Sequence, residues 1–200
     1  MKIKLEYVWL DGYRPEPNLR SKVKIVESEV PMELNNIPVW NFDGSSTSQA
    51  ETGNSDRLLK PVRQYTTHGF PFVNDTVYVL CEVLNPDGTP HESNKRSQIG
   101  DNFEDLWFGF EQEYFIREEI NGNILGHKRN ILKGQGEYYC GVGHNVVGRD
   151  FVESQLDMCL HYGIDITGIN AEVALGQWEY QVFLKGKLKG GEDLWMTRYF

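Results

Sequence analysis

The chain has 200 residues, of which 40% are hydrophobic and 12% aromatic, enough to build a core in one large domain or two small ones. Asp and Glu number 29 against 20 for Lys and Arg, so the formal net charge is −9 at pH 7. An acidic chain without a basic stripe is repelled by phosphate backbones and anionic lipid surfaces, which argues against nucleic acid or a membrane as a partner.

The start of the chain, MKIKLEYVWL, alternates charged and apolar residues and lacks the unbroken apolar segment of a signal peptide. No stretch approaches the length of a membrane span. The three cysteines, Cys81, Cys140 and Cys159, form no CxxC pair. They indicate neither a disulfide framework nor a zinc site, and each is interpreted as a small core residue. A cytoplasmic protein is the expectation.

Alternation at period two, or a short apolar run between turn residues, predicts β-strands in several places. These are residues 2–10, 20–26, 76–84, 107–116, 164–173 and 178–184. Turns are predicted at residues 85–88 (NPDG) and, as a hairpin, at residues 121–123 (NGN). Strands therefore dominate, with a few helices between them. The predicted class is α+β with mostly antiparallel sheets.

One helix is well marked after Asp150, which is predicted as its N-cap, with Glu153 completing a capping box. Apolar residues follow at helical spacing, and Gly163 suits the position just beyond the helix end. The last residues, DLWMTRYF, are also predicted to be helical. The polar segment 92–104 lacks an apolar run and predicts a boundary between a smaller domain, 1–97, and a second one, 98–200.

The stretch WFGFEQEYFI, residues 107–116, places two carboxylates in a predicted strand. Since alternate residues share a face, Glu111 and Glu113 point the same way, and Phe108, Phe110 and Tyr114 point into a core. One interpretation is the solvent-facing side of an edge strand. The alternative is a functional pair, because two buried like charges are costly unless something positive lies between them.

The same arrangement recurs further along the chain. Glu172 ends the apolar strand GINAEV, and Glu179 alternates with Trp178 and Tyr180 in QWEYQV. Several strands with one aromatic face and one carboxylate face indicate a sheet that lines a cavity. Hard divalent cations such as Mg²⁺ prefer carboxylate oxygens, so Glu111 and Glu113 are predicted to be metal ligands. With no histidine nearby in sequence, zinc is a poorer match.

The segment 41–55, NFDGSSTSQAETGNS, is too long and polar for a simple turn. It is either a solvated surface loop or a functional loop in which a tight turn presents Asp43. Further on, Gly143 and Gly148 have the spacing of a phosphate-binding P-loop, but Arg149 and Asp150 replace its Lys and Ser/Thr. The residues that would contact phosphate and Mg²⁺ are therefore missing, so a glycine-rich turn into a helix is the better interpretation.

Taken together, these stretches closely resemble the type II glutamine synthetases. The matching segments follow the family's order and span almost the whole chain: EYVWLDGY, WNFDGSSTSQAETGNSD, WFGFEQEY, YYCGVG followed by GRD, and GINAEVALGQWEYQ. The resemblance implies a ligase that joins ammonia to L-glutamate with ATP through a γ-glutamyl phosphate, using Mg²⁺ or Mn²⁺. It also implies an N-terminal β-grasp domain, followed by the first part of a catalytic domain built on a curved antiparallel sheet.

The family's residue roles carry over to matching positions. The resemblance implies that the metal ligands are Glu111, Glu113, Glu172 and Glu179. It implies that Asp43 binds and deprotonates ammonium, with Asp56 in the same region. It implies nucleotide contacts at Glu111, Glu179, Tyr180, Gln181 and Val182. After Gln181 the chain reads VFLKGK where many members have Gly-Pro, which is a departure at the nucleotide segment.

Family members assemble as decamers of two pentameric rings with active sites between neighbours, so Asp43 would serve the adjacent chain. Family chains also continue past the equivalent of Phe200, so the 200-residue chain alone is expected to be inactive. The alternative function is therefore a non-catalytic metal-binding or structural module of the same ancestry. A third is a carboxylate–amine ligase using another amine, against which the intact DGSS loop argues.

Overall fold

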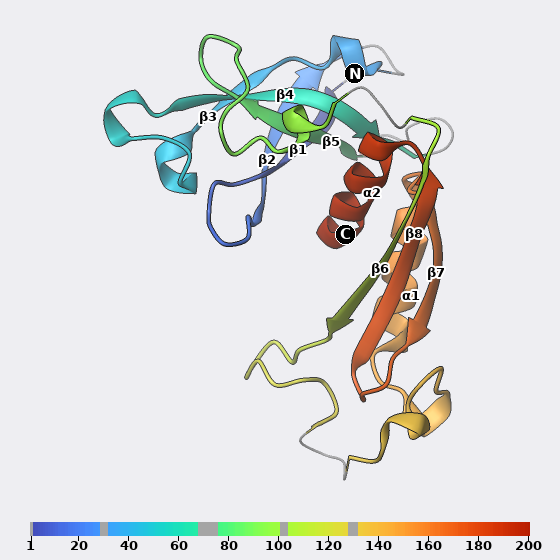
Figure 1. The fold of residues 1–200 in the computed structure, drawn as a ribbon. Coiled ribbons are helices and arrows are strands. Elements are labelled where there is room, and N and C mark those ends of the chain that lie inside the picture. Colours follow the sequence, from blue (N-terminus) through green and yellow to red (C-terminus); the bar gives the residue numbers. More distant parts are fainter. Residues whose placement is uncertain (1, 29–31, 68–75, 101–103, 128–131) are drawn as a thin grey trace. The chain divides into compact units, whose positions relative to one another are not determined.

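The computed structural model describes residues 2–28, 32–67, 76–100, 104–127 and 132–200 (Figure 1). The chain forms two compact units, residues 1–102 with Tyr199 and residues 103–198 with Phe200. The first is called unit 1 and the second unit 2, and each is described by itself. Part of the segment predicted to separate two domains, residues 101–103, lies outside the described residues. The predicted boundary at 97/98 stays a prediction.

Unit 1 contains a five-stranded sheet in the order β2-β1-β5-β4-β3, in which only the β1–β5 pair is parallel. Its strands are β1 (Lys2–Leu10), β2 (Leu19–Glu27), β3 (Trp40–Asp43), β4 (Asp56–Tyr65) and β5 (Thr76–Leu84). The pattern of the sequence predicts β1, β2 and β5, but not β3 and β4. Strand β3 is short, and β4 carries Pro61 at a register shift, where a proline without an N–H is tolerated.

The core of unit 1 follows from the period of two. Alternate residues of β1, namely Ile3, Leu5, Tyr7 and Trp9, are buried against Leu59 and the inward residues of β5. Burying a large apolar side chain contributes about 1.5–3 kcal/mol, so this face holds the sheet together. At the edge, β2 places Lys22 over the Trp40 ring, 3.5 Å from its centroid. A charged side chain on an edge strand also discourages pairing with another chain.

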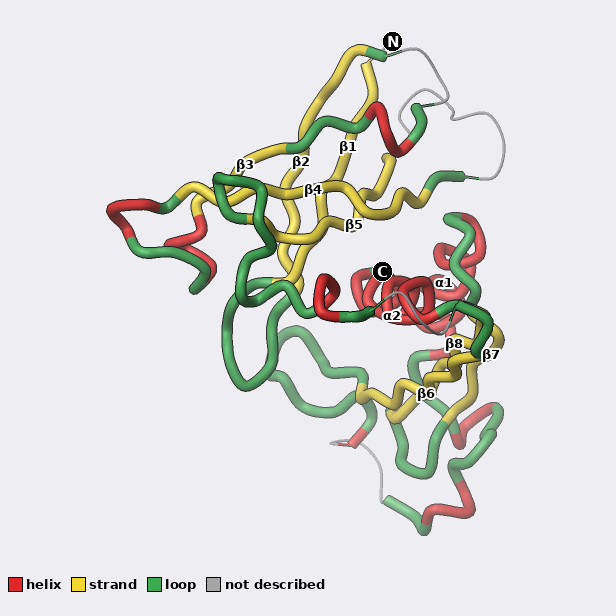
Figure 2. The backbone as a smooth tube through the Cα atoms, turned by 45° about the horizontal axis from the view of Figure 1, so that its top comes forward, coloured by secondary structure: helices red, strands yellow, loops and turns green. Residues whose placement is uncertain are grey.

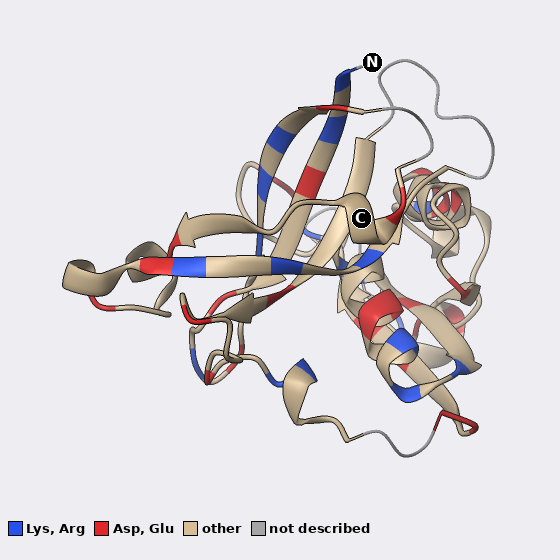
Figure 3. Cartoon of the chain, turned by 90° about the horizontal axis from the view of Figure 1, so that it is seen from above, with Lys and Arg blue, Asp and Glu red and all other residues tan. Residues whose placement is uncertain are grey.

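Figure 3 shows Lys and Arg in blue and Asp and Glu in red on the strands. On the edge strand β2, Arg20, Lys22 and Lys24 alternate and share one face, so a short basic row lies there. Among the described residues, no helix is long and apolar enough to cross a membrane.

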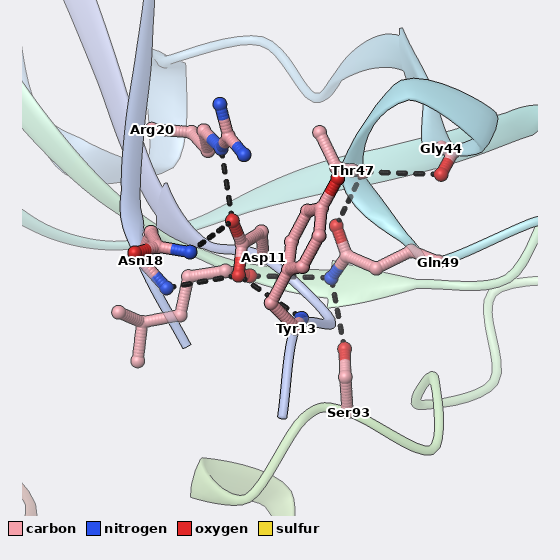
Figure 4. A network of polar contacts seen from close by, with 9 residues as sticks. Asp11, Tyr13, Asn18, Arg20, Gly44, Thr47, Gln49 and Ser93 are labelled. Carbon is pink, nitrogen blue, oxygen red and sulfur yellow. Dashed lines mark hydrogen bonds and ion pairs between the residues drawn. The ribbon is translucent and has the colours of Figure 1, made fainter. Parts of the chain in front are cut away.

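A buried aspartate closes the connection from β1 to β2. Asp11 is 1% exposed and accepts hydrogen bonds from the backbone N–H of Tyr13 and of Asn18, and from the Asn18 amide (Figure 4). Its Oδ2 also lies 2.9 Å from Arg20 Nε in an ion pair. Burial by itself raises the pKa of Asp11, but the hydrogen bonds from Asn18, Tyr13 and Arg20 outweigh it and leave the pKa lowered.

We expect Asp11→Asn to make the stability of unit 1 less dependent on pH. The folded-state pKa lies below the ordinary value of 3.8, so the stabilisation is complete above that value and is lost as the pH falls through the folded pKa. Urea unfolding from pH 7 to pH 3 should therefore show a steeper loss of stability in the wild type than in the variant. Parallel curves for the two proteins would show that Asp11 is not the titrating group.

Unit 2 contains a three-stranded antiparallel sheet in the order β6-β8-β7 (Figure 2). Its strands are β6 (Trp107–Phe115), β7 (Ile166–Ala171) and β8 (Gln177–Lys185), and its helices are α1 (Arg149–His161) and α2 (Lys187–Tyr199). All three strands and helix α1 are predicted by the sequence with shifts of one to two residues at their ends, whereas α2 begins at Lys187, before the predicted start at Asp193. The described 3₁₀ helices of the whole chain are Leu34–Asn36 (η1), Gly44–Thr47 (η2), Thr52–Asn54 (η3), Arg96–Gln98 (η4), Gln135–Glu137 (η6) and Gly143–Asn145 (η7).

Helix α1 covers the apolar face of this sheet. Trp178 is fully buried, and it packs with Val152 of α1 and with Ala171 of β7. Its Nε1 donates to the Val147 carbonyl at 2.9 Å, and the Arg149 guanidinium lies over its ring. The buried apolar residues of β8 and β7 therefore face α1, and the opposite face carries the glutamates together with the exposed rings of Trp107, Phe115 and Phe183.

The predicted N-cap of α1 is wrong. The helix begins at Arg149, because Gly148 has φ 77° and makes the left-handed turn into it. Asp150 instead lies in the first turn, where a negative charge favours the helix dipole. Glu153 does not complete a capping box but pairs with Arg149 one turn away. At the other end, Gly163 has φ 72° and stands just beyond the helix, as predicted.

Candidate metal centre

Strand alternation builds the polar face of the unit 2 sheet. Glu113 of β6 lies directly opposite Glu179 of β8, and Glu111 lies opposite Gln181. On the other side of β8, Asn170 of β7 is opposite Glu179. Because residues two apart share a face, these five side chains are on the same side of the sheet.

Three of the predicted ligands come together on this face. Carboxylate oxygens of Glu113, Glu172 and Glu179 all lie within 4.8 Å of one another. Glu172 and Glu179 are each 8% exposed, whereas Glu113 is open to solvent. Glu172 joins the other two because β7 ends at Ala171 and the chain then turns back into β8.

Neutral amides hold each carboxylate in place. Gln177 Nε2 donates to Glu113 Oε2 at 2.7 Å, and Asn170 Nδ2 donates to Glu172 Oε1 at 3.0 Å. Gln181 Nε2 donates to Glu179 Oε1 and to Asn170 Oδ1. Within the described part of the chain, the ion pairs involve other carboxylates. The three negative charges are thus oriented by hydrogen bonds but not neutralised.

The arrangement fits a hard divalent cation. Three like charges at this separation are unfavourable alone, and burial of two of them adds a desolvation cost. A cation between the oxygens removes both problems, and an all-oxygen donor set suits Mg²⁺ or Mn²⁺. The amides would act as groups that orient the ligands and keep them available.

The other predicted site residues of unit 2 lie on both faces of the sheet. Glu111 is exposed and stands outside the group of three, although it shares their face. Gln181 lies beside Glu179 on the polar face. Tyr180 and Val182 are buried, and alternation puts them on the apolar side. Any contact of Tyr180 or Val182 with a nucleotide would therefore use the backbone.

The sequence does not predict that amides orient the carboxylates, and Gln181 is predicted only as a nucleotide contact. Gln177 and Gln181 alternate with Trp178 and Tyr180, so the same period of two that singles out Glu179 also places them on its face. That signal was present but carries less weight, since an amide is common on any polar surface. Asn170 could be found only from the register of β7 against β8.

Unit 1 holds the two predicted aspartates, and it brings them together. Asp43 ends β3 and is paired directly with Asp56, the first residue of β4. Both are exposed. Asp43 Oδ1 accepts from Ser45 Oγ at 2.6 Å and from Ser45 N at 2.9 Å. These hydrogen bonds from Ser45 lower the pKa of Asp43.

Comparisons with known proteins agree with this picture. The family profile described as "Glutamine synthetase, beta-Grasp domain" matches residues 2–86. A protein of Bradyrhizobium diazoefficiens named glutamine synthetase is 52% identical over an alignment of 205 positions, which covers 99% of this chain and 57% of that protein. One of Streptomyces viridochromogenes with the same name is 46% identical over all of this chain and 59% of its own length.

The fold comparison gives the same result. The solved structure of Plasmodium falciparum glutamine synthetase matches 98% of this chain and 44% of its own, with a TM-score of 0.68 at 13% sequence identity. The predicted α+β fold with an N-terminal β-grasp domain is confirmed. The chain spans under two thirds of the curated relatives described above. Almost the whole chain is thus similar to part of proteins named glutamine synthetase, and residues 2–86 match the β-grasp domain of that family.

Proposed function

We propose that this chain supplies divalent-cation ligands and the ammonium-facing aspartate of a glutamate–ammonia ligase, which uses ATP to form L-glutamine. The observation that carries the proposal is the group of Glu113, Glu172 and Glu179, whose charges are oriented but not neutralised among the described residues. The names of the relatives support it, since those described above are glutamine synthetases.

The proposed reaction has two steps. The γ-carboxylate of glutamate attacks the terminal phosphorus of ATP and gives γ-glutamyl phosphate and ADP, and ammonia then displaces phosphate. A bound Mg²⁺ or Mn²⁺ would neutralise and align the phosphate and carboxylate oxygens. Glu113, Glu172 and Glu179 would hold it, and Glu111 would join them once ligands are bound. The nucleotide would lie along residues 179–182.

Asp43 is assigned to ammonium. Ammonium cannot attack until it loses a proton, and a carboxylate beside it serves as counter-ion and proton acceptor. The hydrogen bonds from Ser45 lower the pKa of Asp43, and Asp56 adds a second carboxylate directly opposite. Unit 1 would thus present the ammonium-binding loop, and unit 2 would form part of the catalytic domain. A cytoplasmic decamer is the assembly that the resemblance implies.

The test is a hybrid enzyme. Residues 1–200 would replace the matched region of the Bradyrhizobium diazoefficiens glutamine synthetase, to which they are 52% identical. We expect the hybrid to form glutamine from glutamate, ammonia and ATP, and Glu113→Gln to reduce that rate by about a hundredfold or more. A folded hybrid that binds metal but releases no ADP would overturn the ligase assignment.

The alternative is a non-catalytic metal-binding module, in which the group of Glu113, Glu172 and Glu179 would hold the ion. It predicts that the 200-residue chain binds Mn²⁺ and that neither the chain nor the hybrid forms glutamine. Replacing ammonia by small primary amines in the hybrid assay tests the third function. A faster reaction with an amine than with ammonia would identify a different carboxylate–amine ligase.

A further inference from the structure

The segment between β3 and β4 is anchored by one buried side chain, Gln49, which is 3% exposed. Its Nε2 donates to the Leu10 carbonyl at 3.2 Å and to Ser93 Oγ at 2.8 Å (Figure 4). Its Oε1 accepts from Thr47 Oγ1 at 2.8 Å. The amide group therefore joins three parts of unit 1 and uses both its donor and acceptor atoms.

Gln49 also closes the turn that presents Asp43. Its backbone N–H donates to the Gly44 carbonyl at 2.9 Å, and Thr47 Oγ1 lies 3.2 Å from the same oxygen. This 3₁₀ turn, Gly44–Thr47, contains Ser45, whose N–H and hydroxyl both donate to Asp43. The Gln49 side chain is thus linked through Thr47 and the backbone of the turn to Ser45, which donates both hydrogen bonds to the Asp43 carboxylate.

The far end of the anchor is also fixed. Ser93 N donates to His91 Nδ1 at 3.1 Å, so this nitrogen is an acceptor. The Ser93 hydroxyl lies 2.9 Å from it and can donate there, which leaves its oxygen free to accept from Gln49. Burial, followed by the positive charge of Arg57, lowers the pKa of His91 and favours the neutral ring that this arrangement needs.

The backbones meet too closely for the turn to shift. A Cβ on Gly12 would lie 2.2 Å from the Ser48 carbonyl oxygen and 2.8 Å from Gln49 Cγ. The Gly12 N–H donates to the Thr47 carbonyl at 2.9 Å. Arg57 Nε donates to the Gln49 carbonyl at 2.9 Å and ties the same turn to β4. The turn is thus held on both sides, with the Gln49 side chain between them.

We propose that Gln49 is a positioning residue that sets the place of the Asp43 carboxylate by locking the Gly44–Thr47 turn onto the loops that follow β1 and β5. Its importance for catalysis rests on the proposed function of Asp43. The positioning itself can be measured on the 200-residue chain without any activity.

The experiment is NMR on the chain with Gln49→Leu. We expect hydrogen exchange of the Ser45 amide to accelerate by about tenfold or more, because the three hydrogen bonds of the Gln49 side chain, to Thr47, Leu10 and Ser93, are lost. The titration midpoint of the Asp43 carboxyl carbon should also rise towards the ordinary value of 3.8. Gln98→Leu, at an exposed glutamine of unit 1, is the matched control and should change neither quantity.

If Gln49→Leu does not fold, a second pair of variants tests the same proposal. Thr47→Val removes the hydroxyl between Gln49 and Gly44 at nearly constant volume and should shift both readouts in the same direction. Thr47→Ser should restore them. Unchanged Ser45 exchange and Asp43 titration in a folded Gln49→Leu or Thr47→Val protein would overturn the proposal. An active Asp43→Asn hybrid would instead refute the role of Asp43 and leave the positioning result intact.

Discussion

Replacing Glu179 by Gln should weaken Mn²⁺ binding by about a hundredfold or more. Removing a group that only orients a metal ligand already lowers metal affinity by about tenfold to a hundredfold, and Glu179 is a proposed ligand itself. Glu179 is buried, and its oxygens lie within 4.8 Å of those of Glu113 and Glu172. At a hundredfold excess over its dissociation constant, Mn²⁺ should stabilise the wild type by about 2.7 kcal/mol and the variant by much less. Isothermal titration calorimetry and thermal unfolding measure the two effects.

Without metal, we expect Glu179→Gln to stabilise the fold rather than to weaken it. Removing one of three close carboxylates relieves repulsion, which we expect to raise stability by about 1 kcal/mol, or about 2–4 °C in Tm for a chain of this length. Glu119→Gln, at an exposed position in the loop after β6, is the control and should alter neither binding nor stability. Equal stabilisation of wild type and Glu179→Gln by Mn²⁺ would remove Glu179 from the site.

Trp178→Ala should cost unit 2 about 3–5 kcal/mol of stability, the usual cost of truncating a buried aromatic residue. Trp178 is fully buried against Val152 and Ala171, and its indole N–H donates to the Val147 carbonyl. Its loss should also weaken metal binding, because it lies between Gln177 and Glu179 in β8 and fixes which way they face. Urea unfolding followed by circular dichroism gives the free energy.

A second tryptophan in the same sheet provides the control. Trp107 of β6 is 62% exposed and stacks only on Phe183 among the described ring pairs. Trp107→Ala should therefore cost about 1 kcal/mol or less. Similar costs for the two substitutions would mean that the apolar face against α1 is not the core of unit 2.

Local pattern was sufficient for the elements that place the candidate site. The period of two in WFGFEQEYF put Glu111 and Glu113 on one face, and the structure has them there, opposite Gln181 and Glu179. The apolar runs at β1 and β5 predict strands with the observed ends. The helix over residues 149–161 was found from its apolar spacing, although its first residue depends on the backbone of Gly148.

The features that the sequence did not predict depend on pairing between segments that are far apart in the chain. Strand β4 contains Pro61 and several charges, so only its position between β3 and β5 makes it a strand. The pairing of Asp43 with Asp56 is set by the register of β3 on β4 across a long loop. The group of three glutamates likewise depends on where β7 ends, which no local pattern near Glu172 determines.

The most direct test of the proposed metal centre is NMR of the 200-residue chain during titration with Mn²⁺, whose unpaired electrons broaden signals close to the ion. We expect the signals of Glu113, Glu172 and Glu179 to disappear first, and Glu179→Gln to abolish this order. Early loss of signals centred on other acidic residues, with those of the three glutamates retained, would contradict it.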